Sequence, residues 1–193
     1  MILASPAKQP QQKPFRYTFI PSALEPDVAG ALLDWFEKEA PWTLRIAEFY
    51  EQHEFVVTNE LLPAHLRELF STEELDSLRA HVERLFGVRL AARIDITAHR
   101  LTKGQRIRIH NDYIPGQETQ RLLIQLNRGW LDENGGALML FNSREPTDVH
   151  RILRPVHNSG LLFEISSDSL HAVTPIHSGE RFTLVMSFFS AAL

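Results

Sequence analysis

Apolar positions along the chain follow two different periods. Between residue 15 and about residue 88 they recur mainly at helical spacing, whereas from about 89 to 190 they mostly alternate with polar positions. The sequence therefore predicts one domain over residues 15–193, with a helix-rich support region at 15–88 and a strand-rich core at 89–190. Residues 1–14 form a Pro/Gln/Lys stretch after a short apolar start, and we expect a flexible lead-in there.

Two amphipathic helices are predicted in the support region. Ser22 and Glu25 have the spacing of a capping box before the first helix, and Pro26 suits its first turn. The face that this helix would bury carries Val28, Leu32, Trp35 and Phe36.

The second helix has clearer ends. Ser71 and Glu74 repeat the capping-box spacing before it, and Gly87 can end it. Its apolar stripe consists of Leu75, Leu78, Val82 and Leu85.

Short strands separated by turns are predicted in the core. Apolar and polar side chains alternate, as in a strand with one buried face, through Ile94, Asp95, Ile96, Thr97, Ala98 and His99. The other strand candidates are Phe15–Ile20, one or two strands in Trp42–Val57, Arg106–Tyr113, Arg121–Asn127, Ala137–Asn142, Val149–Val156, Leu161–Ile165 and Arg181–Phe189. Many short strands with regular turns predict a mainly β fold with flanking helices (α+β), in which a sandwich or barrel carries the helices on one outer face.

Composition narrows the class of partner. The 193 residues carry a net charge of −4, so no basic surplus indicates nucleic acid or an anionic membrane as a partner. The chain has no cysteine, which excludes disulfides, thiolate catalysis and iron–sulfur clusters and is compatible with a cytoplasmic protein. No apolar run is long enough to span a bilayer, and the start of the chain lacks the apolar core of a secretory signal. The oligomeric state stays open.

A small group of side chains suggests a metal site. His110 and Asp112 are two residues apart in a predicted strand, so both would point to one face and could reach one ion. The third ligand must come from elsewhere, and His171 can supply it. His177 is the rival, but it follows Pro175 in a stretch that is typical of a turn. Two imidazoles and one carboxylate can hold a divalent iron and leave its opposite face open.

Arg181 adds a possible anion site. An arginine beside such a metal can hold a dicarboxylate by forked, charge-assisted hydrogen bonds. On a strand that begins there, Thr183 would share its face. The alternative is a strand-end arginine paired with a surface acid.

The spacing of these residues resembles a known family. Gly104-Gln105 precedes His110-Asn111-Asp112, a double glycine at 135–136 precedes a strand, and the last part follows His171-x-Val173-x-Pro175-x-x-x-Gly179-x-Arg181. Over roughly 94–189 the chain resembles the prolyl 4-hydroxylase-type branch of the iron(II)- and 2-oxoglutarate-dependent dioxygenases.

The resemblance implies a double-stranded β-helix, a jelly-roll barrel with iron in its mouth. By motif match, His110, Asp112 and His171 are the Fe(II) ligands and Arg181 binds the far carboxylate of 2-oxoglutarate. The implied reaction uses O2 to convert 2-oxoglutarate into succinate and carbon dioxide while a C–H bond is hydroxylated. Related halogenases have a small residue in place of Asp112, so hydroxylation is expected, with desaturation or ring closure as alternatives.

The co-substrate pocket departs from the family pattern. Leu138 matches an apolar position that lines 2-oxoglutarate, and Thr183 is a further expected contact. Some members have tyrosines where this chain has Leu101 and Gln125. Gln125 can still form hydrogen bonds to the co-substrate and Leu101 cannot, so the pocket should be built differently.

Arginines near the metal motif suggest a substrate class. Arg106 and Arg108 share the strand parity of His110, and Arg121 lies on a neighbouring strand. If they project toward the iron pocket, a substrate carrying a carboxylate is expected, such as an amino acid or a peptide. The alternative is that these arginines pair with acids at the barrel rim, namely Asp95, Glu118 or Glu133.

Aromatic and loop residues could complete the substrate site. Tyr113 and Trp130 could form aromatic walls or could simply pack. The segment Asn127–Asn134 could be a lid over the barrel mouth or an ordinary hairpin connection.

Three functions stay open on the residues alone. The first is a 2-oxoglutarate-dependent hydroxylase of a small metabolite, favoured because no added recognition domain is evident, or of prolyl or other residues in a peptide. The second is a non-catalytic metal-binding barrel acting as a sensor or scaffold. The third is a zinc hydrolase, for which no motif places a general base.

Overall fold

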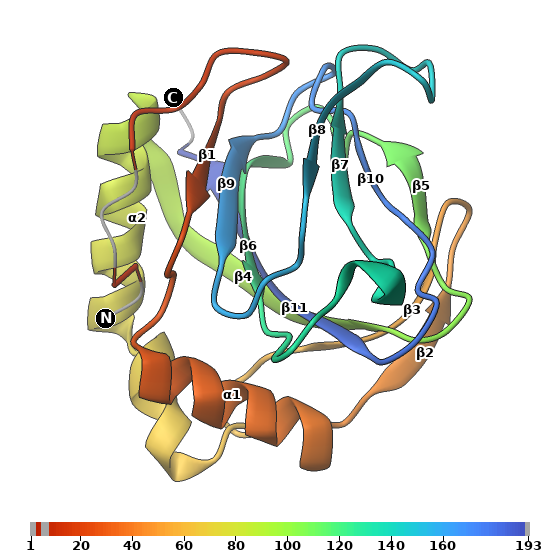
Figure 1. The fold of residues 1–193 in the computed structure, drawn as a ribbon. Coiled ribbons are helices and arrows are strands. Elements are labelled where there is room, and N and C mark those ends of the chain that lie inside the picture. The colour runs from red at the N-terminus through yellow and green to blue at the C-terminus, as the bar shows by residue number, and fades with distance from the viewer. Residues whose placement is uncertain (1–2, 5–7, 192–193) are drawn as a thin grey trace.

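Two antiparallel sheets face each other in the computed structural model of the chain, which describes residues 3–4 and 8–191 (Figure 1). Within these residues the larger sheet has the strand order β1 (Tyr17–Ile20), β9 (Gly160–Glu164), β6 (Glu118–Gln125), β11 (Arg181–Ser190), β4 (Leu90–Leu101), β3 (Glu51–Val56) and β2 (Thr43–Ile46). The smaller sheet has the order β5 (Ile107–His110), β10 (His171–Val173), β7 (Leu138–Phe141) and β8 (Val149–Leu153). The structure confirms the predicted mainly β fold with flanking helices and the jelly-roll architecture.

Strand β11 shows how the two faces of the larger sheet differ. Its even-numbered side chains pack in the core between this sheet and the helices: Phe182, Leu184, Met186 and Phe188. Its odd-numbered side chains Arg181, Thr183, Val185 and Ser187 face the space between the two sheets. One strand therefore supplies both the core and the wall of an internal cavity.

Two helices cover the outer face of the larger sheet, as the apolar patterns predicted (Figure 1). Helix α1 is Pro26–Lys38 and helix α2 is Thr72–Phe86. The Ser71 hydroxyl accepts a hydrogen bond from the Glu74 N–H, and Gly87 ends α2 with φ of 65°. The capping box predicted for α1 is wrong, because Glu25 precedes this helix without a side-chain cap and the Ser22 hydroxyl donates to the Leu24 carbonyl.

Several element boundaries differ from the predictions. The stretch 42–57 forms two strands, β2 and β3, and β4 extends well beyond the predicted segment. The pattern missed two 3-10 helices, Ala64–Phe70 and Asp132–Asn134. None of the helices in the described part of the chain is long and apolar enough to cross a membrane.

Part of the predicted flexible lead-in is docked on the domain. The Leu3 N–H donates to the Ala23 carbonyl at 2.6 Å, and Gln11 forms a β-bridge with Tyr17. Residues 1–2 and 5–7 of the lead-in lie outside the described residues. Of these residues, Gln11 adds an isolated bridge to the β1 edge of the larger sheet.

The open side of the barrel is closed by the β2–β3 hairpin. Its turn reaches across to the smaller sheet, where Tyr50 forms a bridge with Ile107 of β5. This contact joins the last strand pair of one sheet to the edge strand of the other (Figure 1). The hairpin therefore forms one wall of the cavity between the sheets.

Candidate metal centre

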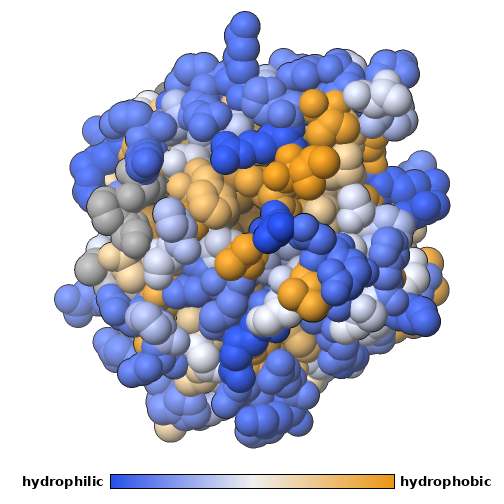
Figure 2. Space-filling view, viewed as in Figure 1, coloured by the Kyte–Doolittle hydropathy of each residue, from blue (hydrophilic) through white to orange (hydrophobic). Residues whose placement is uncertain are grey.

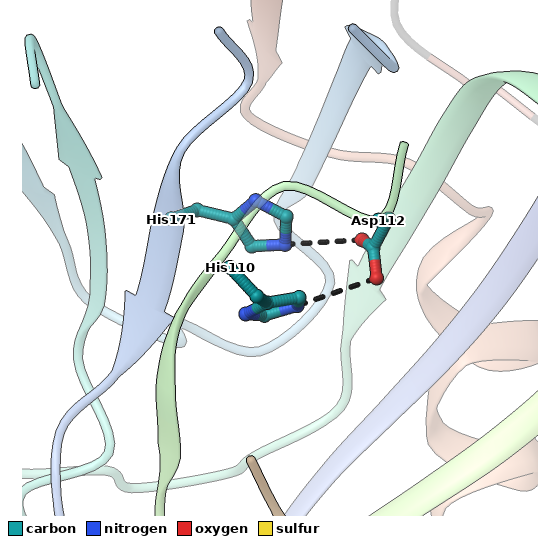
Figure 3. A group of neighbouring side chains, drawn as sticks. All are labelled: His110, Asp112 and His171. Atoms are coloured by element: carbon teal, nitrogen blue, oxygen red, sulfur yellow. Dashed lines mark ion pairs between the residues drawn. The ribbon is translucent and has the colours of Figure 1, made fainter. Parts of the chain in front are cut away.

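Two histidines face each other across a pair of antiparallel strands. His110 is the last residue of β5 and is the register partner of His171, the first residue of β10. Their ring centroids are 4.2 Å apart. Two residues that are 61 positions apart in the sequence thus bring their imidazoles together (Figure 3).

Asp112 joins them by a turn of the backbone. Strand β5 ends at His110, so the predicted strand Arg106–Tyr113 is too long and strand alternation is not what brings His110 and Asp112 together. The side chain of Asn111 accepts a hydrogen bond from the Tyr113 N–H and donates one to the Ser167 carbonyl, which fixes a tight turn. Asp112 itself has φ of 57°, a left-handed conformation that aspartate tolerates better than most residues.

The three side chains can hold one metal ion. Asp112 Oδ1 lies 3.3 Å from His110 Nε2, and Asp112 Oδ2 lies 3.2 Å from His171 Nε2 (Figure 3). One ligand atom from each residue lies within 4.8 Å of the others. The rival His177 is exposed and stands outside this group.

Backbone carbonyls set the tautomers of both histidines. His110 Nδ1 is 2.8 Å from the Arg108 carbonyl oxygen, and His171 Nδ1 is 2.7 Å from the Ser169 carbonyl oxygen. Because a carbonyl can only accept, each Nδ1 must carry the proton and donate. Each Nε2 is then left with a free lone pair directed at the carboxylate, as a metal ligand requires.

The protonation states also suit a cation. Burial alone would raise the pKa of Asp112, but the Arg121 guanidinium beside it holds that pKa well below its usual value. Burial and the neighbouring His110 lower the pKa of His171. At neutral pH the site therefore presents one carboxylate and, at His171, a neutral imidazole.

Arg121 supports the carboxylate from the next sheet. Its Nη1 lies 2.5 Å from Asp112 Oδ2, its Nε donates to the Ser187 hydroxyl at 3.2 Å, and its Nη2 lies 3.5 Å from Glu118. Arg121 thus lies in the cavity as predicted, but paired with acids. This matches the alternative in which the arginines serve neighbouring carboxylates.

Arg181 is a buried cation without a carboxylate partner among the described residues. It is 2% exposed, and burial lowers its pKa to about 10. Its Nη1 donates to the Thr183 hydroxyl at 2.8 Å, and that hydroxyl donates to Gln125 Oε1 at 3.1 Å. Its Nε is buried and has no hydrogen-bond partner. A buried, under-satisfied guanidinium at a cavity is a fitting site for the carboxylate of a bound anion.

The double glycine lets the backbone pass close to this arginine. Gly135 and Gly136 have φ of 74° and 67°. A Cβ on Gly135 would lie 2.1 Å from the Pro175 carbonyl oxygen, and a Cβ on Gly136 would lie 3.0 Å from Arg181 Cδ. Glycine is therefore required at both positions, because the backbone passes close to the Pro175 carbonyl and to the Arg181 side chain. The sequence pattern alone did not explain this.

A cavity of about 360 Å³ connects the metal ligands with Arg181. Leu101, Leu138 and Thr183 line this cavity, whereas Gln125 does not line it and accepts a hydrogen bond from the Thr183 hydroxyl. Its other apolar lining residues are Phe49, Ile107, Leu123, Val173 and Val185. One space thus contains the three possible metal ligands, the buried guanidinium and an apolar wall.

Two arginines predicted to face this cavity do not. Arg106 and Arg108 are exposed and do not line it. The register of β5 against β10 shifts, with three residue steps from Ile107 to His110 opposite two steps from His171 to Val173. Because of this irregularity, Ile107 and His110 both face the cavity. The alternation of a regular strand therefore does not predict where Arg106 and Arg108 point.

The predicted aromatic walls also lie elsewhere. Tyr113 is 46% exposed and does not line the cavity. Trp130 donates its indole N–H to the Gly135 carbonyl at 2.9 Å and packs beside Gly136 and Gly179. Trp130 therefore supports the double-glycine turn.

The sequence reasoning missed the polar face of β4. Asp95, Thr97 and His99 were assigned to the outer side of a half-buried strand, but they line the cavity. Burial and the arginines at 121 and 181 lower the pKa of His99 to about 3, so its imidazole is neutral. Leu101, which was expected at the pocket, lies two residues after His99 on the same strand. Side chains two apart on a strand share a face, so this spacing could have predicted His99 in the cavity.

Comparisons with known proteins support a family and a fold. The model of the 2OG-Fe(II) oxygenase superfamily matches residues 96–189. No curated protein gives a significant match. Among solved structures, a Pseudomonas putida prolyl-4-hydroxylase is similar with a TM-score of 0.74 and 20% identity, over 91% of this chain and 93% of that one.

Two further structures are similar. A prolyl hydroxylase from Trichoplax adhaerens, in complex with a peptide fragment of the hypoxia-inducible factor oxygen degradation domain, has a TM-score of 0.73 and 15% identity, with 90% of this chain and 83% of that one covered. A viral collagen prolyl hydroxylase from Paramecium Bursaria Chlorella virus-1, with 2OG, has a TM-score of 0.66 and 15% identity over 91% and 96%. At these identities the similarity establishes the fold.

The His-Asp-His geometry predicts a single metal site of defined composition. We expect the wild-type protein to bind one equivalent of Co(II), and His171→Ala to lose affinity by about a hundredfold or more, because even supporting residues of such sites contribute ten- to a hundredfold. Co(II) titration followed by visible absorption measures this. His177→Ala is the matched control and should bind like wild type; equal losses in both variants would contradict the assignment of His171.

Burial of His99 predicts a pH-dependent stability. The folded-state pKa is about 3 against an ordinary value of 6.5, so the unfolded chain takes up a proton that the folded protein does not. Stability is therefore lost as pH falls below 6.5, by up to about 1.4 kcal/mol per pH unit. Urea unfolding at several pH values between 7 and 4.5 measures this. The free energy of unfolding of the wild type should fall relative to that of His99→Gln as the pH is lowered, whereas exposed His177→Gln should show the same pH dependence as the wild type. A constant difference between wild type and His99→Gln would contradict this.

Proposed function

The model of the 2OG-Fe(II) oxygenase superfamily matches residues 96–189, and from this match we propose that the chain is a member of that superfamily and hydroxylates an unactivated C–H bond of an amino-acid unit, free or within a peptide. Enzymes of this family use Fe(II), 2-oxoglutarate and O2, which sets aside the scaffold and zinc-hydrolase alternatives. The finer parts of the proposal concern which residues perform each task and which substrate they accept.

His110, Asp112 and His171 are proposed to hold the iron. Both imidazoles present Nε2, the carboxylate is ionised, and one ligand atom from each residue lies within 4.8 Å of the others. Three protein ligands leave positions free on a six-coordinate ion for the co-substrate and O2. When bound, iron with 2-oxoglutarate and O2 supplies the oxidising equivalent that inserts one oxygen atom into the substrate and leaves succinate and carbon dioxide.

Arg181 is the observation that carries the co-substrate assignment. A buried guanidinium costs free energy unless it is paired, and the described residues give it a hydroxyl but no carboxylate. The far carboxylate of 2-oxoglutarate would complete it, with the Thr183 hydroxyl as a second donor once released from Gln125. The apolar residues Leu101 and Leu138 would contact the methylene groups and exclude water from the same space.

The proposal of a carboxylate-bearing substrate loses its original support. Of the arginines that suggested it, Arg106 and Arg108 lie outside the cavity and Arg121 is paired with Asp112 and Glu118. The remaining lining arginine near the hairpin, Arg45, lies 3.4 Å from Glu54. Recognition of the substrate is therefore proposed to depend on shape and on neutral hydrogen bonds.

Two forms of the amino-acid unit are considered. The sequence favoured a free small molecule. The structural neighbours at TM-scores of 0.73 and 0.74 are prolyl hydroxylases, and one holds a peptide, which supports prolyl hydroxylation in a peptide as the second candidate.

Removing the Arg181 charge should weaken 2-oxoglutarate binding selectively. For Arg181→Met we expect the Kd for 2-oxoglutarate to rise by about 30-fold or more, corresponding to about 2 kcal/mol for a truncated buried charge pair. Calorimetric titration of the Mn(II)-loaded protein measures this. The metal affinity should stay unchanged, and the exposed Arg106→Met is the control. An unaltered 2-oxoglutarate affinity in Arg181→Met would remove the basis of the assignment.

Substrate class is tested by stimulated turnover. Succinate release should exceed the uncoupled background with members of a panel of free amino acids, proline-containing peptides and pathway carboxylates. The product should carry one added oxygen atom by mass spectrometry. Stimulation by carboxylates that lack an amino-acid unit, with none by amino acids or peptides, would contradict the proposed class.

A further inference from the structure

The tip of the β2–β3 hairpin is attached to the strand that carries a metal ligand. This hairpin tip, residues 47–50, is closed by a hydrogen bond from the Ala47 N–H to the Tyr50 carbonyl at 2.9 Å. The Arg108 N–H donates to the Phe49 carbonyl at 2.9 Å, and the Arg108 guanidinium donates to the Glu48 carbonyl at 2.8 Å. Figure 1 shows the hairpin reaching from the edge of the larger sheet to β5.

Phe49 stacks on the imidazole of His110. The two ring centroids are 4.5 Å apart and the planes differ by 27°. The Arg108 carbonyl holds the Nδ1 of the same imidazole at 2.8 Å. Rotation of the His110 ring is thus restricted by a hydrogen bond at Nδ1 and by an aromatic face beside it.

We propose that the hairpin tip positions the metal ligand His110, with Phe49 as the positioning residue and the Arg108 side chain as the tether that keeps Phe49 in place. This inference rests on the proposed metal site. It gives Arg108 a role in place of the substrate contact suggested by its sequence position. Its guanidinium holds a carbonyl of the hairpin turn, 2.8 Å away, and faces away from the cavity.

The tip is held at β5 by the Tyr50–Ile107 bridge, by the two hydrogen bonds from Arg108 and by the Phe49 stack, and much of its surroundings is exposed. All four residues of β2 are exposed, and Glu48 and Arg108 are exposed as well. Segments with little buried apolar area and exposed hydrogen bonds open at low free energy. A metal ion bound at Nε2 would add a further restraint to the His110 ring, which the hydrogen bond at Nδ1 and Phe49 already hold, so Phe49 would stack on a firmer platform.

The same hairpin carries a wall of the cavity. Arg45, Tyr50, Gln52 and Glu54 come from it and line the space in front of the metal ligands. Coupling between two sites is reciprocal, so a metal ion that favours the docked tip is itself bound more tightly when the tip is docked. Metal loading would therefore order the hairpin wall of the cavity before any substrate arrives.

Co(II) affinity of matched variants tests the positioning role. Phe49→Leu keeps an apolar side chain but removes the stacked ring, and Arg108→Gln removes the tether but keeps the backbone carbonyl at His110. We expect each to weaken Co(II) binding about tenfold, as for other supporting residues of metal sites. Phe49→Tyr should restore wild-type affinity, and Arg106→Gln, an exposed neighbour outside the cavity, should match wild type.

Hydrogen exchange separates this role from simple packing. In the wild type, Co(II) alone should slow amide exchange in peptides covering residues 43–56, and Phe49→Leu should lose that protection at saturating Co(II). Wild-type affinity in both Phe49→Leu and Arg108→Gln, or no protection of residues 43–56 on loading the wild type, overturns the inference while leaving the metal site intact. Failure of the wild type to bind Co(II) overturns both the inference and the proposed function.

Discussion

The pairing of His110 with His171 across β5 and β10, with the Asp112 carboxylate turned in between, is the constraint on which the rest of the site depends. It fixes three donors from two distant segments at one point. The two carbonyl hydrogen bonds to Nδ1 then decide which nitrogen of each ring faces the carboxylate. Two of the four strands of the smaller sheet, β5 and β10, carry this arrangement.

The cavity has an ionised carboxylate at one end and an incompletely paired guanidinium at the other, and bound ions would pair with both. At one end the Arg121 guanidinium keeps Asp112 ionised between the two imidazoles. At the other, Arg181 is buried with one unused N–H. Such an arrangement costs stability in the free protein and is typical of a site that receives ions. The apolar face of β11, which packs in the core against the helices, offsets this loss of folding free energy.

Much of this could be predicted from the sequence, for reasons that differ between residues. The apolar patterns predicted both helices, and the turn-like stretch after Pro175 favoured His171 over His177. The route by which Asp112 reaches the site could not be predicted, since it depends on a left-handed residue after Asn111 rather than on strand alternation. The parity argument for Arg106 and Arg108 failed because the β5–β10 register shifts between Ile107 and His110, a feature that only the pairing of two distant strands creates. His99 was overlooked because a polar strand face was equated with solvent, although in this barrel that face lines the cavity.

One spectrum tests the central claim most directly. Under anaerobic conditions, addition of Fe(II) and then 2-oxoglutarate to the purified protein should produce a weak visible charge-transfer band, because the keto acid binds an iron held by His110, Asp112 and His171. The band should need both additions. Its absence from a protein that binds Fe(II), or its persistence in His110→Ala, would contradict the account.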